Sequence, residues 1–584
     1  MTRRVSILAY TLVIALVLLG LQNWSIAVGH IERHVIAGIE DRTGLKVTAL
    51  ERAEIAILPL PRVSLSHVSF TKADGTLAGK ALRLKAHARL LPLLFGRLSF
   101  ERIDLVVPEI DVALIGPDEG PSSWLATPLA YLTSLQNQSR IVITSGTIFA
   151  RADGAIRTTL RDVNLVVDER EPSEPIVIAG TVNWRGVPTE IGATWPVAGE
   201  RARVSLSAAS ELASLRLEGT RSGGGEPVIN GQVTIATRSL SELLGWFGEK
   251  PRLAAAINRF DLSAEAQIKP NEISLSNASL SLDGDRLDGA LALGEAGSRW
   301  ALSGTLAGAA LDLGRLYDRL DLPRAEPAGG KTTPLEFDAW TAHDIDLRVS
   351  VDAARISGAR LTDVATQLLV KKGRFEAGLL RASAYGGTAK ARLLAVSAPG
   401  GIDVKLQAGF DRINLAQGAA DMPDFPRLSG TGNLQLALEG SGTTAEDVVA
   451  SLAGKANVAL RQGELGGFAF LDLLRRAERN PVAALREWRQ GKTPFESLSA
   501  SATISSGMVT IGDGQMSGPV YKLTLAGQSS LSERWIEMNG QLAPANGAYQ
   551  IPLALKGALD NPSLTPNTDA LLSPTNSLPA SLLR

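Results

Sequence analysis

Alternation of apolar and polar residues along most of the chain is the feature that most restricts its fold. In one stretch, Leu434, Leu436 and Leu438 alternate with polar or small residues, and this period of two is typical of a strand with one apolar face. Similar runs recur along the chain, separated by turns of Gly, Asn or Asp, for example over residues 273–293 and 345–370. The sequence therefore predicts a mainly β protein built from many one-sided strands.

A few short helices are expected between these strands. Thr443 or Thr444 can cap a helix that extends to Gly454, because carboxylates follow in its first turn, where the helix dipole favours them. Alternation resumes after this helix. A change of phase at Ser66–His67 predicts a bulge in an early strand. Further helices are predicted over residues 239–247, 311–320 and 468–489, the last divided near Asn480.

One-sided strands must cover their apolar side, because leaving it in water costs roughly 25 cal/mol per Å². The predicted helices are too few to do so, which leaves a second sheet or a sheet curled on itself. A curled sheet that stays open along one side is a trough lined by aliphatic side chains, and acyl chains are a suitable filling. A series of β-sandwiches with dry cores satisfies the same periodicity, so the pattern leaves both architectures open.

The N-terminal segment is predicted to cross a membrane. Residues 5–28 contain no charged residue and are long enough to span the hydrocarbon of a bilayer, and Arg3 and Arg4 precede them. By the positive-inside rule, the N-terminus stays in the cytoplasm and the rest of the chain lies on the far side. A signal peptide cleaved after Ala27 or Gly29 is the alternative, although the apolar region of such peptides is usually about 7–15 residues long. Residues 29–43 are expected to continue as a helix that leaves the membrane.

Composition removes several classes of function. The formal net charge is −1, with 59 basic and 60 acidic residues, so no electrostatic feature favours a nucleic acid as partner. The chain has no cysteine, which excludes disulfides, thiolate metal sites and a cysteine nucleophile.

Residues with catalytic or metal-binding chemistry form no convincing combination. His30 and His34 have the spacing of a zinc pair, but Glu32 does not complete the usual motif, and a polar helix facing headgroups is favoured. The DGDRLD segment, which begins at Asp283, lacks the Gly and the distal Glu of a calcium loop, so a β-turn is favoured. Gly440–Gly442 lacks the pattern of a nucleophile elbow. We expect no catalytic residues, no metal site, no cofactor and no enzymatic activity.

The C-terminal half resembles the AsmA family of Gram-negative envelope proteins. The resemblance rests on four segments that occur in the family's order: GTGNLQLALEGSG, SLAGKANVALRQGEL, YKLTLAGQ and IPLALKGALDNPSLTP. It extends in weaker form to FERIDLVVPEIDVAL, in a region that is similar to the chorein domain of bridge-like lipid transporters. The resemblance implies a single N-terminal transmembrane helix followed by an elongated, curled antiparallel β-sheet that forms a hydrophobic groove.

These observations predict the following organisation: an anchor at residues 1–28, a chorein-like helix and strands at 29–115, a middle β-groove region at 116–322, a linker at 323–342, an AsmA-like C-terminal β-groove region with inserted helices at 343–560, and a flexible tail at 561–584. The resemblance implies an inner-membrane protein whose bulk lies in the periplasm. It also implies transfer of phospholipid between the inner and outer membranes, with outer-membrane or periplasmic proteins as further partners.

The predicted lipid-binding site is a set of inward-facing aliphatic residues. Its members are Leu347, Val349, Leu434, Leu436, Leu438, Val458, Leu460, Leu523 and Leu525. The alternative function, which the resemblance also implies, is that of an assembly factor for outer-membrane proteins that carries no lipid. In that case the apolar strand faces are buried in dry cores.

Overall fold

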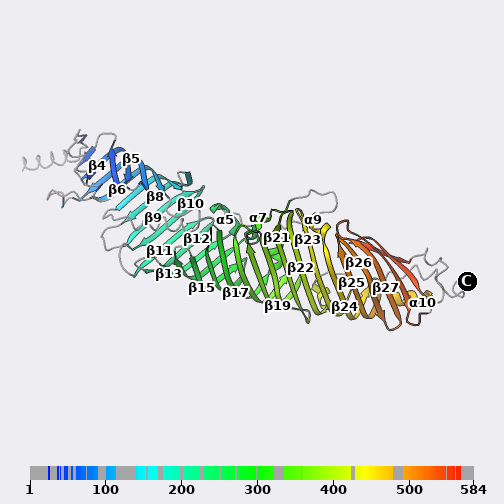
Figure 1. Cartoon of the computed structure of the whole chain (residues 1–584). Helices are drawn as coiled ribbons and strands as arrows, with labels where there is room; N and C mark the ends of the chain where they lie inside the picture. The colour runs from blue at the N-terminus through cyan, green and yellow to red at the C-terminus, as the bar shows by residue number, and fades with distance from the viewer. Residues whose placement is uncertain are drawn as a thin grey trace, which may run out of the picture. The chain divides into compact units, whose positions relative to one another are not determined.

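A computed structural model of the protein describes residues 24–25, 36–37, 40, 45–49, 54–56, 61–73, 75–89, 92, 100–113, 140–152, 155–168, 175–196, 201–222, 228–248, 252–269, 272–297, 299–320, 334–356, 358–421, 428–477, 491–547, 549–559 and 561–566. The described residues form thirty strands and a few short helices, so the protein is mainly β, as predicted (Figure 1). All the described strands are assigned to one sheet, and the last of them, β30 (Asn561–Pro566), pairs with β29 (Ile551–Ala558) and with no other described strand. The sheet is therefore not closed into a barrel.

Residue contacts divide the chain into two compact units. Unit 1 comprises residues 1–249, 258–281 and 290–300, and unit 2 comprises residues 250–257, 282–289 and 301–584. Among the described residues, unit 1 contains β1 (Trp24–Ser25), β2 (Leu45–Ala49), β3 (Glu54–Ala56), β4 (Arg62–Lys72), β5 (Leu77–Ala88), β6 (Phe100–Ala113), β7 (Arg140–Ala152), β8 (Ala155–Asp168), β9 (Ile176–Trp184), β10 (Val187–Trp195), β11 (Arg201–Ser210), β12 (Ala213–Ser222), β13 (Val228–Thr237), α5 (Leu240–Phe247) and β14 (Phe260–Lys269). Strands β15 (Glu272–Leu282), β16 (Asp285–Ala296) and β17 (Arg299–Asp312) contain residues of both units.

The strands of unit 1 pair mostly with their neighbours in sequence. Strands β4 to β6 are antiparallel, β6 and β7 are parallel, and β7 to β14 are antiparallel again. Its main core lies at β2 and β4 to β6, where the largest buried side chains include Leu65, Phe70 and Phe100. The bulge predicted at Ser66–His67 is wrong: Ser66 lies opposite Arg83 and Val68 opposite Ala81, so one residue of each strand, His67 and Leu82, lies between these pairs and neither strand has an extra residue. The change of phase itself is present, because Leu65 and Val68 are both buried and His67 between them has a φ of 48°.

Unit 2 contains the rest of the described elements. They are η1 (Arg252–Ala256), α6 (Leu313–Arg319), α7 (Phe337–Trp340), β18 (Asp344–Ile356), β19 (Ala359–Lys371), β20 (Arg374–Ala384), β21 (Gly387–Ala398), β22 (Gly401–Asn414), α8 (Leu415–Asp421), β23 (Thr431–Gly442), α9 (Ala445–Ser451), β24 (Ala453–Gly466), α10 (Phe470–Ala477), β25 (Lys492–Ser505), β26 (Met508–Gly518), β27 (Tyr521–Ser530), β28 (Trp535–Pro544), β29 and β30. Strands β17 and β18 are parallel, and the remaining neighbours from β18 to β30 are antiparallel.

Short helices occur where capping residues predict them. Ser239 caps α5 by accepting the N–H of Glu242, and Gly248 ends that helix in the left-handed region. Thr444 and Asp447 form a reciprocal capping box at α9. Helix α9 ends at Ser451, earlier than the predicted Gly454, because Ala453 and the residues after it pair with β23.

The predicted transmembrane anchor falls almost entirely outside the described residues. Of residues 1–28, the structure describes Trp24 and Ser25, which form strand β1 paired with β3 and are not helical. Ile36, Ala37 and Glu40 are helical, in agreement with the helix predicted over residues 29–43. In the described part of the chain, no helix has the length and apolar character needed to span a membrane.

Candidate functional site

The nine predicted lipid-binding residues lie on one face of the sheet in unit 2. Residues directly opposite each other in paired strands point to the same face. Following the register from Leu347 gives the row Leu368, Ala377, Leu393, Leu406 and Leu438. Leu434 lies opposite Val458, and the row from Leu460 continues through Leu498, Met516 and Leu523. We call this side of unit 2 the apolar face.

The apolar face is half-open over β22 and β23. Leu434 is 37% exposed, and Phe410, directly opposite it on β22, is 36% exposed. Leu347, Val349, Leu436 and Leu438 are intermediate in burial, whereas the polar neighbour Gln435 on the other face of β23 is exposed. These aliphatic side chains therefore keep part of their apolar surface in solvent, which a dry sandwich core would cover.

The same face is closed at its C-terminal end. Leu460 is 5% exposed and Leu523 is 3% exposed, and Val458 and Leu525 pack against the same cluster. Helix α10 contributes Phe470, Leu473 and Leu474 to this cluster, all of them buried. By register all nine residues share this face, and a helix covers those on β24 and β27. Their role in lipid binding stays a prediction.

Two short segments tie together the strands that carry the half-open part. At one end of the strands, residues 334–341 run from β23 to the β19–β20 turn: Leu335 N–H donates to Thr443 O (2.9 Å) and Gly373 N–H donates to Thr341 Oγ1 (3.2 Å). Four of these residues belong to α7, so part of the predicted linker is held by hydrogen bonds. We call this segment the strap.

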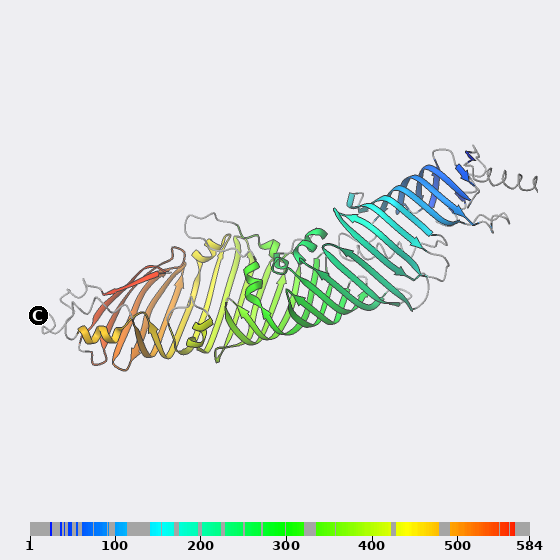
Figure 2. The same cartoon turned by 180° about the vertical axis from the view of Figure 1, so that it is seen from behind.

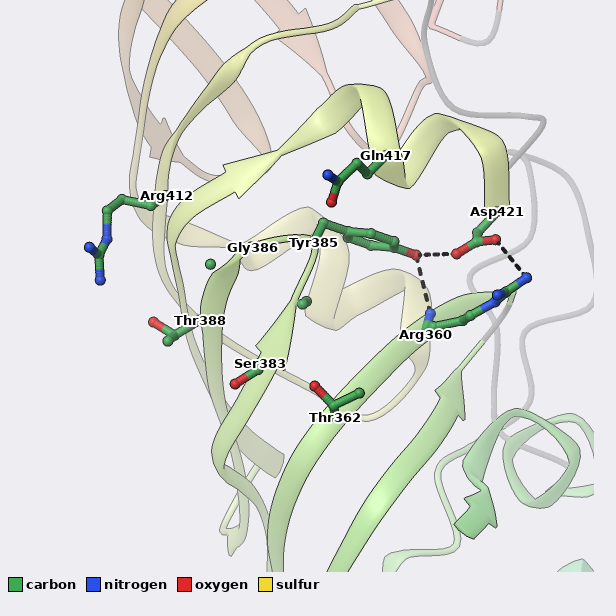
Figure 3. A pocket seen from close by; sticks show the side chains of 11 residues that line it. Arg360, Thr362, Ser383, Tyr385, Gly386, Thr388, Arg412, Gln417 and Asp421 are labelled. Atoms are coloured by element: carbon green, nitrogen blue, oxygen red, sulfur yellow. Dashed lines mark hydrogen bonds and ion pairs between the residues drawn. The ribbon is translucent and has the colours of Figure 1, made fainter.

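At the other end of the strands, helix α8 connects β22 with β19. Its last residue, Asp421, accepts a hydrogen bond from the Tyr385 hydroxyl (3.2 Å) and pairs with the Arg360 guanidinium (3.3 Å), while the backbone N–H of Arg360 donates to the same hydroxyl (3.1 Å; Figure 3). Tyr385 lies in the β20–β21 turn with a φ of 47° and is followed by Gly386 with a φ of 80°, a turn that fits a two-residue hairpin. Together, the strap and α8 link the ends of strands β19 to β23, a part of the sheet that curls in Figure 2.

The cavity beside α8 is lined mostly by residues with polar or charged side chains. It has a volume of about 970 Å³, and its lining includes Arg360, Thr362, Tyr385, Arg412 and Asp421. Burial, and to a smaller extent the neighbouring Asp421 carboxylate, raise the pKa of the Tyr385 hydroxyl, so this group stays protonated at neutral pH and is not a base. Asp421, Tyr385 and Arg360 are joined by hydrogen bonds and an ion pair, and these interactions hold α8 in place.

Other residues with potential chemistry have structural partners. Asp283 pairs with Arg319 (2.6 Å), and Asp285 pairs with Arg315 (2.5 Å) and accepts the N–H of Asp312 (2.9 Å), so the predicted turn anchors α6. His30 and His34 lie outside the described residues. Within the described ranges, no three His, Asp or Glu side chains gather in a way that could hold a metal ion.

Sequence patterns did not identify every residue of the apolar face. Phe410 is the partner of Leu434, but a single aromatic residue in an alternating run gives no sign of its strand partner. The segment 468–489 was predicted to be helical, with Phe470, Leu473 and Leu474 on one side; the described part of this prediction is confirmed by α10. That this side covers the apolar face depends on tertiary packing.

Comparison with known protein families found a match in the central part of unit 2. Residues 327–513, about a third of the chain, match the AsmA family. The matched segment contains the strap, strands β18 to β25 and helices α8 to α10, and the match confirms the predicted resemblance. No curated protein and no solved structure was found to match the chain.

Proposed function

We propose that this chain, whose residues 327–513 belong to the AsmA family, binds phospholipid on the apolar face of unit 2 and contributes to phospholipid transfer between the inner and outer membranes. The protein is anchored in the inner membrane by residues 1–28, and its bulk lies in the periplasm. Phospholipid is its ligand, the function involves no catalysis, and lipid is handed to partners in the periplasm or outer membrane.

The observation that carries this proposal is the half-open row of aliphatic side chains on β18 to β23. Leu434 and Phe410 are more than a third exposed although they face the side on which their neighbours are apolar. Acyl chains match such a surface, because each buried methylene contributes about 0.8 kcal/mol. Headgroups remain in water at the edge of the apolar face.

Photo-crosslinking in cells tests the proposal. A photo-reactive residue at Leu436 should capture phospholipid, whereas the same residue at Gln435, the neighbour on the opposite face of β23, should not. Mass spectrometry identifies the adducts, and circular dichroism checks that both proteins are folded. Protein adducts without lipid at Leu436 would instead support the assembly-factor function.

A further inference from the structure

Helix α10 lies where the apolar face would otherwise continue. The row from Val458 and Leu460 runs on through Leu498, Met516 and Leu523, all on the same side of the sheet. Beneath α10 this side is lined by aliphatic and aromatic groups that form one cluster with the helix: Leu523, Leu542, Tyr549, Ile551 and Leu553. The lining thus has the same chemistry as the half-open part, and the difference between them is the helix that covers it.

The chain leaves the sheet for α10 and returns to it at two adjacent positions. The chain leaves β24 at Gly466 and returns to β25 at Lys492, and these two residues lie opposite each other. Directly beyond them, Gly467 N–H donates to Gly491 O (2.8 Å), and the two glycines have φ values of 93° and 129°, in the left-handed region that side chains disfavour. The pairing of β24 with β25 is complete without α10, so the helix is an excursion laid on the sheet.

A few specific bonds hold the helix down. The Thr493 hydroxyl accepts the N–H of Phe470 (2.9 Å) and donates to Phe468 O (2.6 Å), and the Tyr549 hydroxyl donates to Leu474 O (2.9 Å). Apolar packing of Phe470, Leu473 and Leu474 adds to this attachment. The outer side of α10 is charged, and Arg475 pairs with Asp472 across 3.8 Å with both side chains more than half exposed.

We propose that the sheet beneath α10 is a second acyl-chain site, continuous with the half-open part of the apolar face, and that α10 occupies it when no lipid does. This inference rests on the proposed function. Acyl methylenes and the side chains of Phe470, Leu473 and Leu474 compete for the same apolar surface, so each excludes the other. Lipid that arrives over β22 and β23 advances toward β30 when α10 moves away from the sheet by rotation about Gly467 and Gly491.

The test uses lipid capture at two positions in the full-length chain in cells. A photo-reactive residue at Leu436 reports on the half-open part, and one at Leu525, which packs against the α10 cluster, reports on the covered part. Leu473→Asp puts a carboxylate into the dry cluster and should expel the helix. Arg475→Gln changes the net charge by the same amount on the exposed side of α10 and is the matched control.

Phospholipid capture at Leu525 should be low in the otherwise unchanged protein and should rise at least about fivefold with Leu473→Asp, with no rise for Arg475→Gln. Tyr549→Phe removes the hydrogen bond from the Tyr549 hydroxyl to Leu474 O without adding charge. It should also raise phospholipid capture at Leu525, but by a smaller factor than Leu473→Asp does. Retained capture at Leu436 shows in every variant that the sheet is intact.

Two results overturn the inference while the proposed function stands. One is unchanged capture at Leu525 in Leu473→Asp and Tyr549→Phe while Leu436 keeps its lipid, because α10 is then a fixed part of the core. The other is strong capture at Leu525 without any helix variant, because α10 then excludes no lipid. Absence of lipid at Leu436 in every protein overturns the proposed function, and the inference with it.

Discussion

At the residue scale, Thr493 shows how one buried side chain fixes the start of α10. Its hydroxyl is fully buried and satisfies two backbone groups, Phe470 N–H and Phe468 C=O. Thr493→Val keeps the volume but removes both hydrogen bonds from a buried site, so we expect a loss of about 2–4 kcal/mol in the free energy of unfolding. Thr493→Ser keeps the hydroxyl and should cost about 1 kcal/mol. Urea unfolding of the full chain in detergent measures both, and equal losses would count against a hydrogen-bonding role.

Glu376 provides a pH-dependent contribution to stability. Hydrogen bonds from Arg374 (2.8 Å) and Arg392 (2.8 Å), in that order of importance, lower the pKa of this carboxyl below its usual value, against the opposing effect of burial. Because the pKa of the folded state is depressed, the stabilisation is present above the unfolded pKa and is lost as the pH falls through the folded pKa. The unfolding temperature of the original protein should therefore exceed that of Glu376→Gln at pH 7, and the two should converge in acid. Parallel curves from pH 7 to pH 3 would contradict this.

At the element scale, the α8 attachment should control local opening more than global stability. Asp421→Ala removes the acceptor shared by Tyr385 and Arg360, but the Arg360 side chain is 70% exposed and its ion pair contributes little. We expect a loss of about 1 kcal/mol or less in unfolding free energy, with clearly faster amide exchange at the start of β19 and in α8. Hydrogen–deuterium exchange measures this. Arg412→Ala, on the far side of the same cavity and 76% exposed, is the control and should leave both segments unchanged.

Local signals in the sequence predicted individual helices and strands better than they predicted which strands pair and where helices pack. The cap at Thr444 and the change of phase at His67 act within a few residues, so the sequence around them was sufficient, although the bulge inferred from that change of phase was wrong. The parallel pairings β6–β7 and β17–β18 were not predicted, because alternation of apolar residues has no strand direction. Both follow long connections, residues 114–139 and 313–343, which a parallel pair requires. The position of α10 was also missed, since its apolar side fits any apolar surface.

At the scale of the whole molecule, each unit has an apolar side of its own. In unit 1, the register places Leu206, Leu217, Val233 and Ala264 in one row, and Leu206 is half-buried. One-sided strands of this kind need a cover along their entire length, because exposed aliphatic surface is costly in every strand. If phospholipid is that cover, lipid should be bound by both units.

The losses of bound lipid caused by one substitution in each unit should add in the double variant. Leu206→Asp and Leu436→Asp each put a carboxylate into one apolar row, and an unpaired charge among acyl chains costs more than several methylenes contribute. Phospholipid per purified full-length chain, measured by mass spectrometry, should fall by roughly a third to a half in each variant and further in the double variant, since distant sites act independently. Ser207→Asp and Gln435→Asp, on the exposed faces of the same strands, should retain full lipid content. Complete loss of lipid in either single variant would show that the two faces load together, which independent sites do not permit.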